Sequence, residues 1–289
     1  MQTTPLDAAA LCDDLRDARI GHTIVALGSV PSTMPVAAAA MDDRATRSGL
    51  VVTAEEQTAG RGRLGRSWQA PAGQALLMTV ALKPPDLPQP LSRLPMLAAV
   101  ALVEAIACCA PALDTRLAIK WPNDVLLQLP DASTQGDTVG KVAGILLESA
   151  FVGEEPAYAL IGMGINVNQD AAAMSALAAA CAPEGMEASG MKPTSLRVAL
   201  GQPCDRAALL VQICRRLEAN LAAPQAAMDS WRRRLITLGR PVDVRVLAHD
   251  AIIRGVAWDV DADGRLIVEL AGGERRHFAA GDVTLRVAR

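Results

Sequence analysis

The pattern of apolar residues changes near Leu238, and this change most limits what the 289-residue chain can fold into. Before Leu238, apolar strand-like runs alternate with long helix-like segments. After it, short valine-rich stretches follow one another at residues 241–247, 252–260, 265–270, 275–278 and 283–287. Asp263-Gly264 and Gly272-Gly273 separate three of these stretches, and such pairs favour tight hairpin turns. We therefore expect a large first domain over residues 1–237 and a small β-barrel or β-sandwich over residues 238–289.

Apolar, β-rich runs indicate strands in the first domain, at residues 50–54, 76–82, 117–121, 142–147 and 158–162. Residues 95–109 are apolar on nearly every side, which is typical of a buried helix. Asp205 is a suitable N-cap for a second helix over residues 206–221. Because strands and helices do not alternate strictly, the pattern predicts an α+β fold with one main mixed sheet.

Two further segments lie between these elements. Residues 128–139 are polar and contain Pro130 and Gly136, so we expect a loop there. Residues 169–192 are rich in Ala, Met and Gly, and their length predicts a partly helical or mobile insertion, for which a lid is one candidate role.

The composition predicts a folded, mildly acidic protein. Hydrophobic residues make up 51% and aromatic residues only 2%, so the core must consist mainly of aliphatic side chains. The sequence pI is about 5.7, and a chain without a basic excess is not expected to bind DNA. The first ten residues lack the pattern of a signal peptide, and the most apolar window, residues 94–113, contains a glutamate and two prolines. We therefore expect no membrane span and a cytoplasmic location.

The six cysteines and three histidines do not predict a metal site. The cysteines form no CxxC pair, so we expect reduced thiols, as in the cytoplasm. His22, His249 and His277 lie far apart in the sequence without obvious partner ligands. No protein-bound metal is expected.

Glycines and arginines interleave over residues 60–66, Gly-Arg-Gly-Arg-Leu-Gly-Arg, and this is the most informative stretch for function. The spacing of Gly60, Gly62 and Gly65 matches the dinucleotide-binding pattern G-x-G-x-x-G. That pattern normally opens a helix, whereas here a proline-containing segment and a predicted strand follow at once. Glycines let the backbone approach an anion, and arginines neutralise phosphate or carboxylate groups. The stretch therefore predicts an anion-binding loop, with an exposed basic turn as the alternative.

Other motifs place polar side chains at strand ends. Residues 120–124, Lys-Trp-Pro-Asn-Asp, put a cation, an amide and a carboxylate after a predicted strand, although they also suit an ordinary turn. Lys141 precedes another apolar strand, and Asn166 follows two glycines at the end of a third. Residues 232–234 are three arginines near the end of a predicted helix, where cations suit the helix dipole, and we expect an exposed surface there.

Taken in this order, the segments resemble the biotin–protein ligase family. Residues 54–68 are similar to the loop that covers biotin and the adenylate in that family. The family's Lys-Trp-Pro-Asn-Asp, Lys-x-x-Gly-Ile and Gly-Ile-Asn motifs match residues 120–124, 141–145 and 164–166. Ser32-Thr33 occupies the place of its Ser-Thr-Asn, with Met34 instead of the asparagine. The resemblance covers residues 21–168 well and the C-terminal domain in outline.

The resemblance implies a catalytic domain related to class II aminoacyl-tRNA synthetases, followed by an SH3-like β-barrel. It implies a ligase that uses ATP and Mg²⁺ to convert biotin to biotinyl-5′-AMP. The biotin then passes to a lysine of a biotin carboxyl carrier protein, a subunit of acetyl-CoA carboxylase or another carboxylase. A monomer or a homodimer is compatible with this resemblance. Only about 31 residues precede Ser32, so we expect no helix-turn-helix repressor domain. A lipoate–protein ligase and a non-catalytic biotin-sensing regulator are the alternatives.

The resemblance also implies roles for individual residues. Biotin would contact Ser32, Thr33, Met34, Gln57, Arg61, Gly62, Arg63 and Lys141. ATP or the adenylate would contact Arg61, Arg63, Arg66, Trp68, Asn123, Lys141 and Asn166. Catalytic roles would fall to Lys141, Arg63, Lys120 and Asp124. The sequence leaves open whether Asp124 accepts a proton or only orients the attacking amine.

Overall fold

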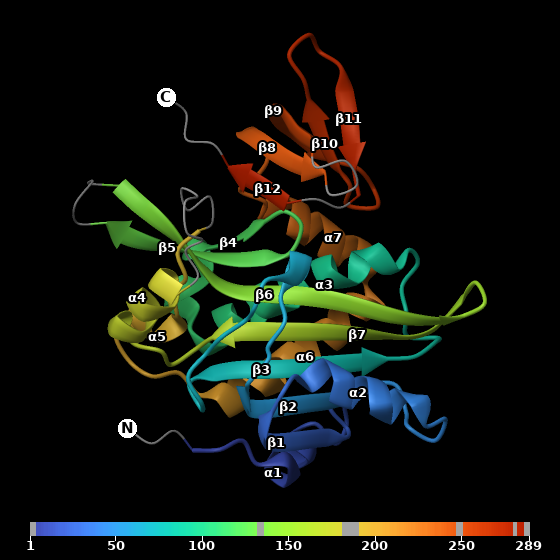
Figure 1. Ribbon diagram of the computed structural model, residues 1–289. Helices are drawn as coiled ribbons and strands as arrows, with labels where there is room; N and C mark the ends of the chain where they lie inside the picture. The colour runs from blue at the N-terminus through green and yellow to red at the C-terminus, as the bar shows by residue number, and fades with distance from the viewer. Residues whose placement is uncertain (1–3, 132–135, 181–190, 247–250, 280–281, 286–289) are drawn as a thin grey trace.

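The computed structural model describes residues 4–131, 136–180, 191–246, 251–279 and 282–285. These residues form two sheets. A seven-stranded sheet carries the helices, and a five-stranded sheet lies at the C-terminal end of the chain (Figure 1). We call the second one the C-terminal sheet.

The seven-stranded sheet has the order β1-β2-β3-β7-β6-β5-β4. Its strands are β1 (Ile24–Val30), β2 (Leu50–Gln57), β3 (Ala75–Leu82), β4 (Leu117–Lys120), β5 (Asp124–Asp131), β6 (Gly136–Val152) and β7 (Glu155–Asn166). β1 and β2 are parallel and are joined by α2 (Thr33–Asp42), whereas the other neighbours are antiparallel. The predicted α+β fold with one main mixed sheet is confirmed. The predicted runs correspond to β2, β3, β4, β6 and β7.

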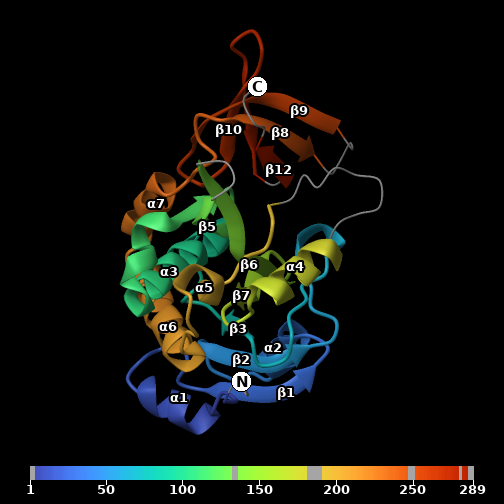
Figure 2. The same ribbon diagram turned by 90° about the vertical axis from the view of Figure 1, so that its left-hand side faces the viewer.

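Helices cover the two faces of this sheet unequally (Figure 2). The long helices α3 (Leu94–Cys109) and α6 (Arg206–Ala222) pack against each other and against one face, with α7 (Pro224–Arg233) beside them. Helix α2 covers part of the opposite face. Both long helices were predicted, and the Asp205 side chain caps α6 by accepting hydrogen bonds from the N–H groups of Ala207 and Ala208.

Helix α3 is the centre of the apolar core. The segment Leu91–Cys109 is long and apolar enough to cross a membrane when judged by length and composition. Most of its side chains are buried inside the protein, against the sheet and against α6. A helix that is apolar on all sides and enclosed in this way is the core helix that the sequence predicted.

Neighbouring residues of one strand serve different faces of the sheet, because side chains alternate along a strand. In β3, Met78 packs in the core on the α3 side. Thr79, the next residue, lies on the α2 side, where its hydroxyl is 2.8 Å from the hydroxyl of Thr33. The same strands thus build both the core and the opposite face.

The structure tests two of the predicted connecting segments. Strand β5 extends to Asp131 and β6 begins at Gly136, so the predicted loop is wrong over residues 128–131 and 136–139. Residues 132–135 lie outside the described residues. In this pairing Gln128, Leu129 and Val139 are half-buried and Thr138 is exposed, so polar residues are tolerated at these strand positions. In the segment 169–192, α4 (Ala171–Ala180) confirms the predicted partial helix, and residues 181–190 lie outside the described part.

The C-terminal sheet has the order β11-β10-β9-β8-β12. Its strands are β8 (Pro241–Val246), β9 (Ala251–Val260), β10 (Leu266–Glu269), β11 (Arg275–Phe278) and β12 (Asp282–Leu285). All described pairs are antiparallel, as the tight-turn pattern predicted. Over the described residues the sheet is open rather than a closed barrel, because β11 and β12 are four-residue strands at opposite edges and each pairs with a single neighbour.

Polar contacts hold the end of α7 and the segment between it and the C-terminal sheet to β4 on one side and to β9 on the other. Ile119 of β4 donates its N–H to Arg234 O at 2.8 Å, and its carbonyl accepts the N–H of Ile236 at 3.0 Å. Arg232 binds the Asp259 carboxylate on β9 at 2.7 Å, and Arg234 binds Asp114 at 2.9 Å. The predicted exposed surface is confirmed for Arg232 and Arg233, and Arg232 forms its ion pair at that surface. The prediction is wrong for Arg234, whose side chain is 27% exposed and half-buried beside Asp114.

Each cysteine in the described residues is a free thiol. Burial raises the pKa of the Cys214 thiol to about 12 and that of Cys109 to about 11. A thiol with so high a pKa carries little reactive thiolate near neutral pH. This agrees with the expectation of reduced cysteines, although Cys181 lies outside the described residues.

Candidate active site

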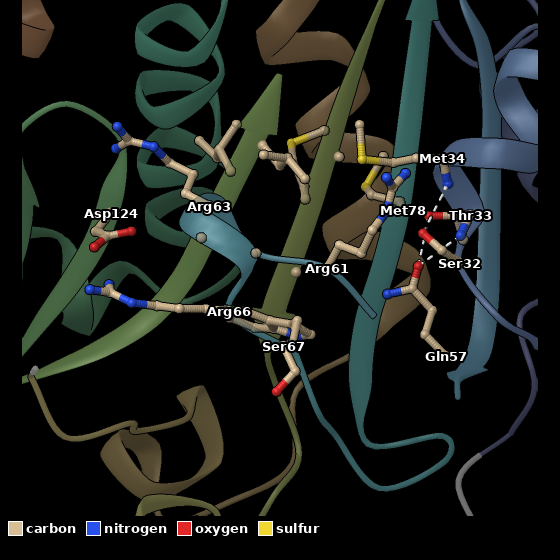
Figure 3. Close-up of a pocket in the computed structure, with 18 of the residues that line it drawn as sticks. Ser32, Thr33, Met34, Gln57, Arg61, Arg63, Arg66, Ser67, Met78 and Asp124 are labelled. Atoms are coloured by element: carbon tan, nitrogen blue, oxygen red, sulfur yellow. Dashed lines mark hydrogen bonds between the residues drawn. The ribbon is translucent and has the colours of Figure 1, made fainter. Parts of the chain in front are cut away.

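A cavity of about 130 Å³ opens on the α2 side of the seven-stranded sheet (Figure 3). Its walls come from the start of α2, the end of β2, the loop over residues 58–68, and strands β5, β6 and β7. The predicted site residues that line it are Ser32, Thr33, Met34, Gln57, Arg61, Gly62, Arg63, Arg66, Trp68, Asp124 and Lys141. Residues that are far apart in the sequence therefore share one chamber.

One end of the cavity is polar and uncharged. Ser32 follows β1 and Gln57 ends β2, and these parallel strands finish at the same edge of the sheet. The Thr33 N–H and hydroxyl both donate to Gln57 Oε1, at 2.8 and 3.0 Å. A backbone N–H can only donate, so this contact fixes which end of the Gln57 amide is the oxygen. The Gln57 NH₂ group is then the end available to donate to a ligand.

The floor of the cavity is a bare stretch of sheet. Gly144 of β6 and Gly164 of β7 are register partners, and Gly162 lies two residues before Gly164 on the same face. A Cβ on Gly164 would lie 2.4 Å from the Trp68 ring, and a Cβ on Gly162 would lie 2.7 Å from Met34 Sδ. Only glycine lets the indole and the thioether lie this close to the strands. Trp68 Nε1 is buried without a hydrogen-bond partner among the described residues.

The other end of the cavity is cationic. Lys141, at the start of the apolar part of β6, places its Nζ 2.7 Å from Asp124 Oδ1. The same ammonium lies 5.7 Å from the centre of the Trp68 ring. Both side chains of the ion pair are about 30% exposed, at 31% and 27%. The carboxylate therefore orients the lysine at the wall of the cavity and leaves it accessible to an anion.

Arginines of the loop over residues 58–68 complete the cationic end. The loop closes on itself, because Gly62 donates its N–H to Arg66 O at 2.7 Å and Trp68 donates to Gly60 O at 2.9 Å. Arg61 pairs with Glu148 at 3.1 Å, and Arg63 donates to Asn123 Oδ1 at 3.1 Å. In Figure 3, Arg63 and Arg66 extend toward the Asp124 side, whereas Arg61 extends toward Thr33 and Met34. The loop thus places cations on the Asp124 side of the cavity and on the side of Thr33 and Met34.

The structure does not place every predicted site residue on the cavity wall. Lys120, Asn123 and Asn166 are buried and do not line it. The Asn123 Nδ2 donates to Ile145 O at 2.6 Å, and its Oδ1 accepts a hydrogen bond from Arg63. Asn123 therefore does not touch the cavity itself but orients Arg63, which lines it. Asn166 Oδ1 accepts from Gln169 Nε2 at 3.0 Å.

Some lining residues were not predicted. They are Ser67, Met78, Ile145, Leu146 and Met163, together with the floor glycines Gly144, Gly162 and Gly164. The floor had a signal in the sequence, because glycines recur at every second position in an otherwise apolar strand at 162 and 164. Met78, Ile145 and Met163 had none, since they belong to the core on the far face and approach the cavity through the bare floor.

The described residues contain no cluster of three or more His, Cys, Asp or Glu side chains that could hold a metal ion. Asp124 is the carboxylate that lines the cavity, and Lys141 already occupies it. A divalent cation at this site would therefore be held mainly by the phosphates of a substrate, as is usual for Mg²⁺.

Comparison with known families agrees with the architecture and with the site. Residues 27–166 match the Biotin/lipoate A/B protein ligase family, and residues 237–286 match the Biotin protein ligase C terminal domain. These two matches define the class of protein. The first covers every residue that lines the cavity, and the second covers the C-terminal sheet.

Individual relatives narrow this class. The chain is 32% identical to the biotin–[acetyl-CoA-carboxylase] ligase of Mycobacterium tuberculosis, over 96% of this chain and 95% of that protein. It is 35% identical to the enzyme of that name from Paracoccus denitrificans, over 78% of this chain and 85% of that protein. This chain belongs to the biotin protein ligase family.

Solved structures share the fold. The biotin protein ligase from Aquifex aeolicus in complex with biotin and ATP superimposes with a TM-score of 0.67. The alignment covers 92% of this chain and 99% of that chain at 23% identity. The two sheets and their order along the chain are therefore those of a known architecture.

Proposed function

We propose that this protein is an ATP-dependent biotin–protein ligase, which forms biotinyl-5′-AMP and transfers the biotin to a lysine of a carrier protein. One observation carries the proposal. A single cavity has an uncharged polar end at Thr33 and Gln57, a bare glycine floor, and a cationic end at Lys141 and the arginine loop. Biotin has the same sequence of groups, namely a polar ureido ring, an apolar body and chain, and a carboxylate.

The chemistry of the two ends orients the substrate. The ureido group suits the polar end, where the Gln57 NH₂ can donate to its carbonyl oxygen. The ring and chain lie over Gly162 and Gly164, between Met34 and Trp68. The carboxylate then points toward Lys141, at the end where ATP would enter. Met34, which replaces the usual asparagine of the family, offers an apolar thioether and no donor to the ligand.

In the first half-reaction a carboxylate oxygen of biotin attacks the α-phosphorus of ATP, and pyrophosphate leaves. Negative charge gathers on the phosphoryl oxygens, so fixed cations supply most of the stabilisation. Lys141, oriented by Asp124, would contact the biotin carboxylate and the α-phosphate, while Arg61, Arg63 and Arg66 lie over them. ATP would arrive with Mg²⁺ on its phosphates. Asn123 would act through Arg63.

In the second half-reaction the neutral amine of a carrier lysine attacks the acyl carbon, and AMP leaves. Asp124 is the carboxylate at the cavity wall, so it is our candidate to orient this amine or accept its proton. Lys120 pairs in register with Asp124, and Asn166 lies two residues after Gly164, so both are near lining residues. We propose Lys120 for the reaction centre and Asn166 for the adenine. An enclosed site would also protect the adenylate from water.

The finer features of the protein are proposals of the same kind. The carrier would be a biotin carboxyl carrier protein of acetyl-CoA carboxylase or of another carboxylase, and the enzyme would work in the cytoplasm as a monomer or a homodimer. We also propose that the first domain, residues 1–237, is related to class II aminoacyl-tRNA synthetases. The second domain, residues 238–289, would be SH3-like, with its described strands forming the open five-stranded sheet rather than a closed barrel.

The test is incubation of the protein with biotin, MgATP and a biotin carboxyl carrier domain, followed by intact mass measurement of the carrier. We expect the addition of one biotinyl group and the release of pyrophosphate, both dependent on ATP. Parallel reactions with lipoate in place of biotin test the nearest alternative. Modification by lipoate alone, or biotin binding without any pyrophosphate release, would contradict the proposal.

A further inference from the structure

Two buried tryptophans hold the turn between β4 and β5. Trp121, 2% exposed, donates its indole N–H to Gly264 O at 2.8 Å, and its backbone N–H donates to Thr237 Oγ1 at 2.9 Å. Trp231, fully buried, donates its indole N–H to Pro122 O at 3.0 Å. A buried indole N–H needs an acceptor, and here each one selects a backbone carbonyl. The turn is therefore fixed from two sides.

The residues that follow this turn hold the cations of the site. Asn123 accepts a hydrogen bond from Arg63 at 3.1 Å, and Asp124 binds Lys141 at 2.7 Å. Asn123 is itself locked by its bond to Ile145 O at 2.6 Å. A shift of the turn would therefore shift the anchors of both Arg63 and Lys141.

Gly264, at the other end of the Trp121 bond, belongs to the β9–β10 turn of the C-terminal sheet. It has a φ of 77°, and a Cβ on it would lie 2.2 Å from Met96 Sδ on α3. The same turn is tied to the first domain by Arg93, which donates to Ala262 O and to Asp263, both at 3.1 Å. The Gly264 carbonyl is thus presented to Trp121 from a turn that is pressed against the core helix.

We propose that the β9–β10 turn of the C-terminal sheet positions the reaction centre through Trp121. The chain of contacts runs from Gly264 O to the Trp121 indole, through the turn to Asn123 and Asp124, and from these to Arg63 and Lys141. Trp121 is a positioning residue, since it does not line the cavity. The C-terminal sheet thereby acts on adenylate formation, in addition to any part it has in docking the carrier. The inference rests on the proposed adenylation of biotin.

The variant Trp121→Phe tests it, because phenylalanine keeps an aromatic ring but has no N–H to donate. We expect kcat for biotin-dependent pyrophosphate release to fall about tenfold, since displacements below 1 Å at reacting groups cost up to about a hundredfold. The KM for biotin should stay within about twofold, because the polar end of the cavity is untouched. Gly264→Ala, which strains the turn because its φ is 77° and crowds Met96, should have the same effect on kcat.

Arg232→Ala is the matched control. It removes an ion pair between the same two domains, Arg232–Asp259, and touches neither the turn nor the cavity. It should lower the melting temperature slightly and leave kcat unchanged. A double-mutant cycle measures the coupling between Trp121 and Asp124 in kcat, which a purely structural role of Trp121 would leave at zero. Asp124→Asn should cost less kcat in the Trp121→Phe background than in the wild type, because the aspartate is already misplaced there.

Wild-type kcat in folded Trp121→Phe or Gly264→Ala protein, or additive effects in the cycle, would overturn the inference. If Trp121→Phe does not fold, Gly264→Ala alone decides the question by the same split between kcat and KM. Absence of pyrophosphate release in the wild-type protein would instead refute the proposed function, so the two failures are distinguishable.

Discussion

The two faces of the seven-stranded sheet are built from the same strands, and they differ where the cavity lies. On the α3 side, Met78, Ile145 and Met163 sit in a continuous aliphatic core. On the α2 side, the neighbouring positions in these strands are Thr79, Gly144 and the pair Gly162 and Gly164. The α3 face is covered with side chains throughout, whereas the α2 face has a bare patch at the three glycines, where a ligand can approach the backbone. Around that patch the α2 face also carries apolar side chains, among them Leu146 and Leu160.

This difference shows how a single sheet can be both scaffold and site. The core face fixes the strands through close packing, which tolerates little displacement. The α2 face, which we call the ligand face, is therefore held by rigid strands, and the short ion pair between Lys141 and Asp124 is enough to orient both side chains there. Substitutions on the two faces should therefore separate activity from stability.

The largest effect is expected for Lys141→Ala on the ligand face. Loss of the cation at the carboxylate and the α-phosphate should lower biotin-dependent pyrophosphate release by at least about a hundredfold. The melting temperature should change little, because Lys141 is partly exposed and belongs to no apolar cluster. A discontinuous assay measures the rate of pyrophosphate release, and thermal denaturation measures the melting temperature. Near-wild-type release by the folded variant would remove Lys141 from the mechanism.

The opposite result is expected for Leu102→Ala on the core face. Leu102 is fully buried in α3, so its truncation leaves a cavity and should lower the free energy of unfolding by about 2–5 kcal/mol. The folded variant should keep the wild-type KM for biotin. Denaturant titration and steady-state kinetics test this, with the exposed Val152→Ala as the control substitution. A large change in KM without a loss of stability would contradict the separation of the two faces.

A smaller effect is expected for Gly164→Ala. Its Cβ would lie 2.4 Å from the Trp68 ring, so the indole must move off the floor. We expect the KM for biotin to rise about tenfold, because an added methyl group and a displaced ring both narrow the space above the strands. Gly28→Ala on β1 is the matched control, since a Cβ there meets no atom within 4 Å. Equal KM values for the two variants would show that the floor is not a binding surface.

The smallest effect concerns the exposed Arg232–Asp259 pair, which lies outside both faces. The hydrogen bond from Arg232 holds the pKa of the Asp259 carboxyl below its usual value. The pair therefore stabilises the fold above the unfolded-state pKa of about 3.9 and loses this contribution as the pH falls through the lower folded-state pKa. Asp259→Asn should cost at most about 1 kcal/mol near neutral pH and nothing in strong acid. Melting curves across this pH range test it; a difference that persists in acid would exclude the ion pair as its cause.

The helices of the core face were predictable, because α3 and α6 show clear apolar patterns and α6 has an N-cap at Asp205. The ligand face was predictable only as a set of motifs. Its supports, β1 and α2, were missed, since β1 is a half-exposed edge strand with Gly28 inside it and α2 contains Pro35 in its first turn. Sequence order also cannot show whether a strand-end side chain reaches a cavity. Lys120 and Asp124 belong to one motif, yet only Asp124 lines the wall.

The scarcity of aromatic residues makes the four tryptophans separate optical reporters. Trp68 lies on the glycine floor beside Lys141, so its emission should change when a ligand enters. Trp258 is 51% exposed and stacks against the Arg275 guanidinium at 3.9 Å, so a water-soluble quencher should reach it first. Trp121 is buried and bonds to Gly264 of the C-terminal sheet, so red-shifted emission from it requires that contact to open. Trp231 is fully buried against Pro122 and reports on unfolding of the larger sheet's surroundings. The intrinsic fluorescence of the protein therefore distinguishes ligand entry from separation of the two sheets without any attached dye.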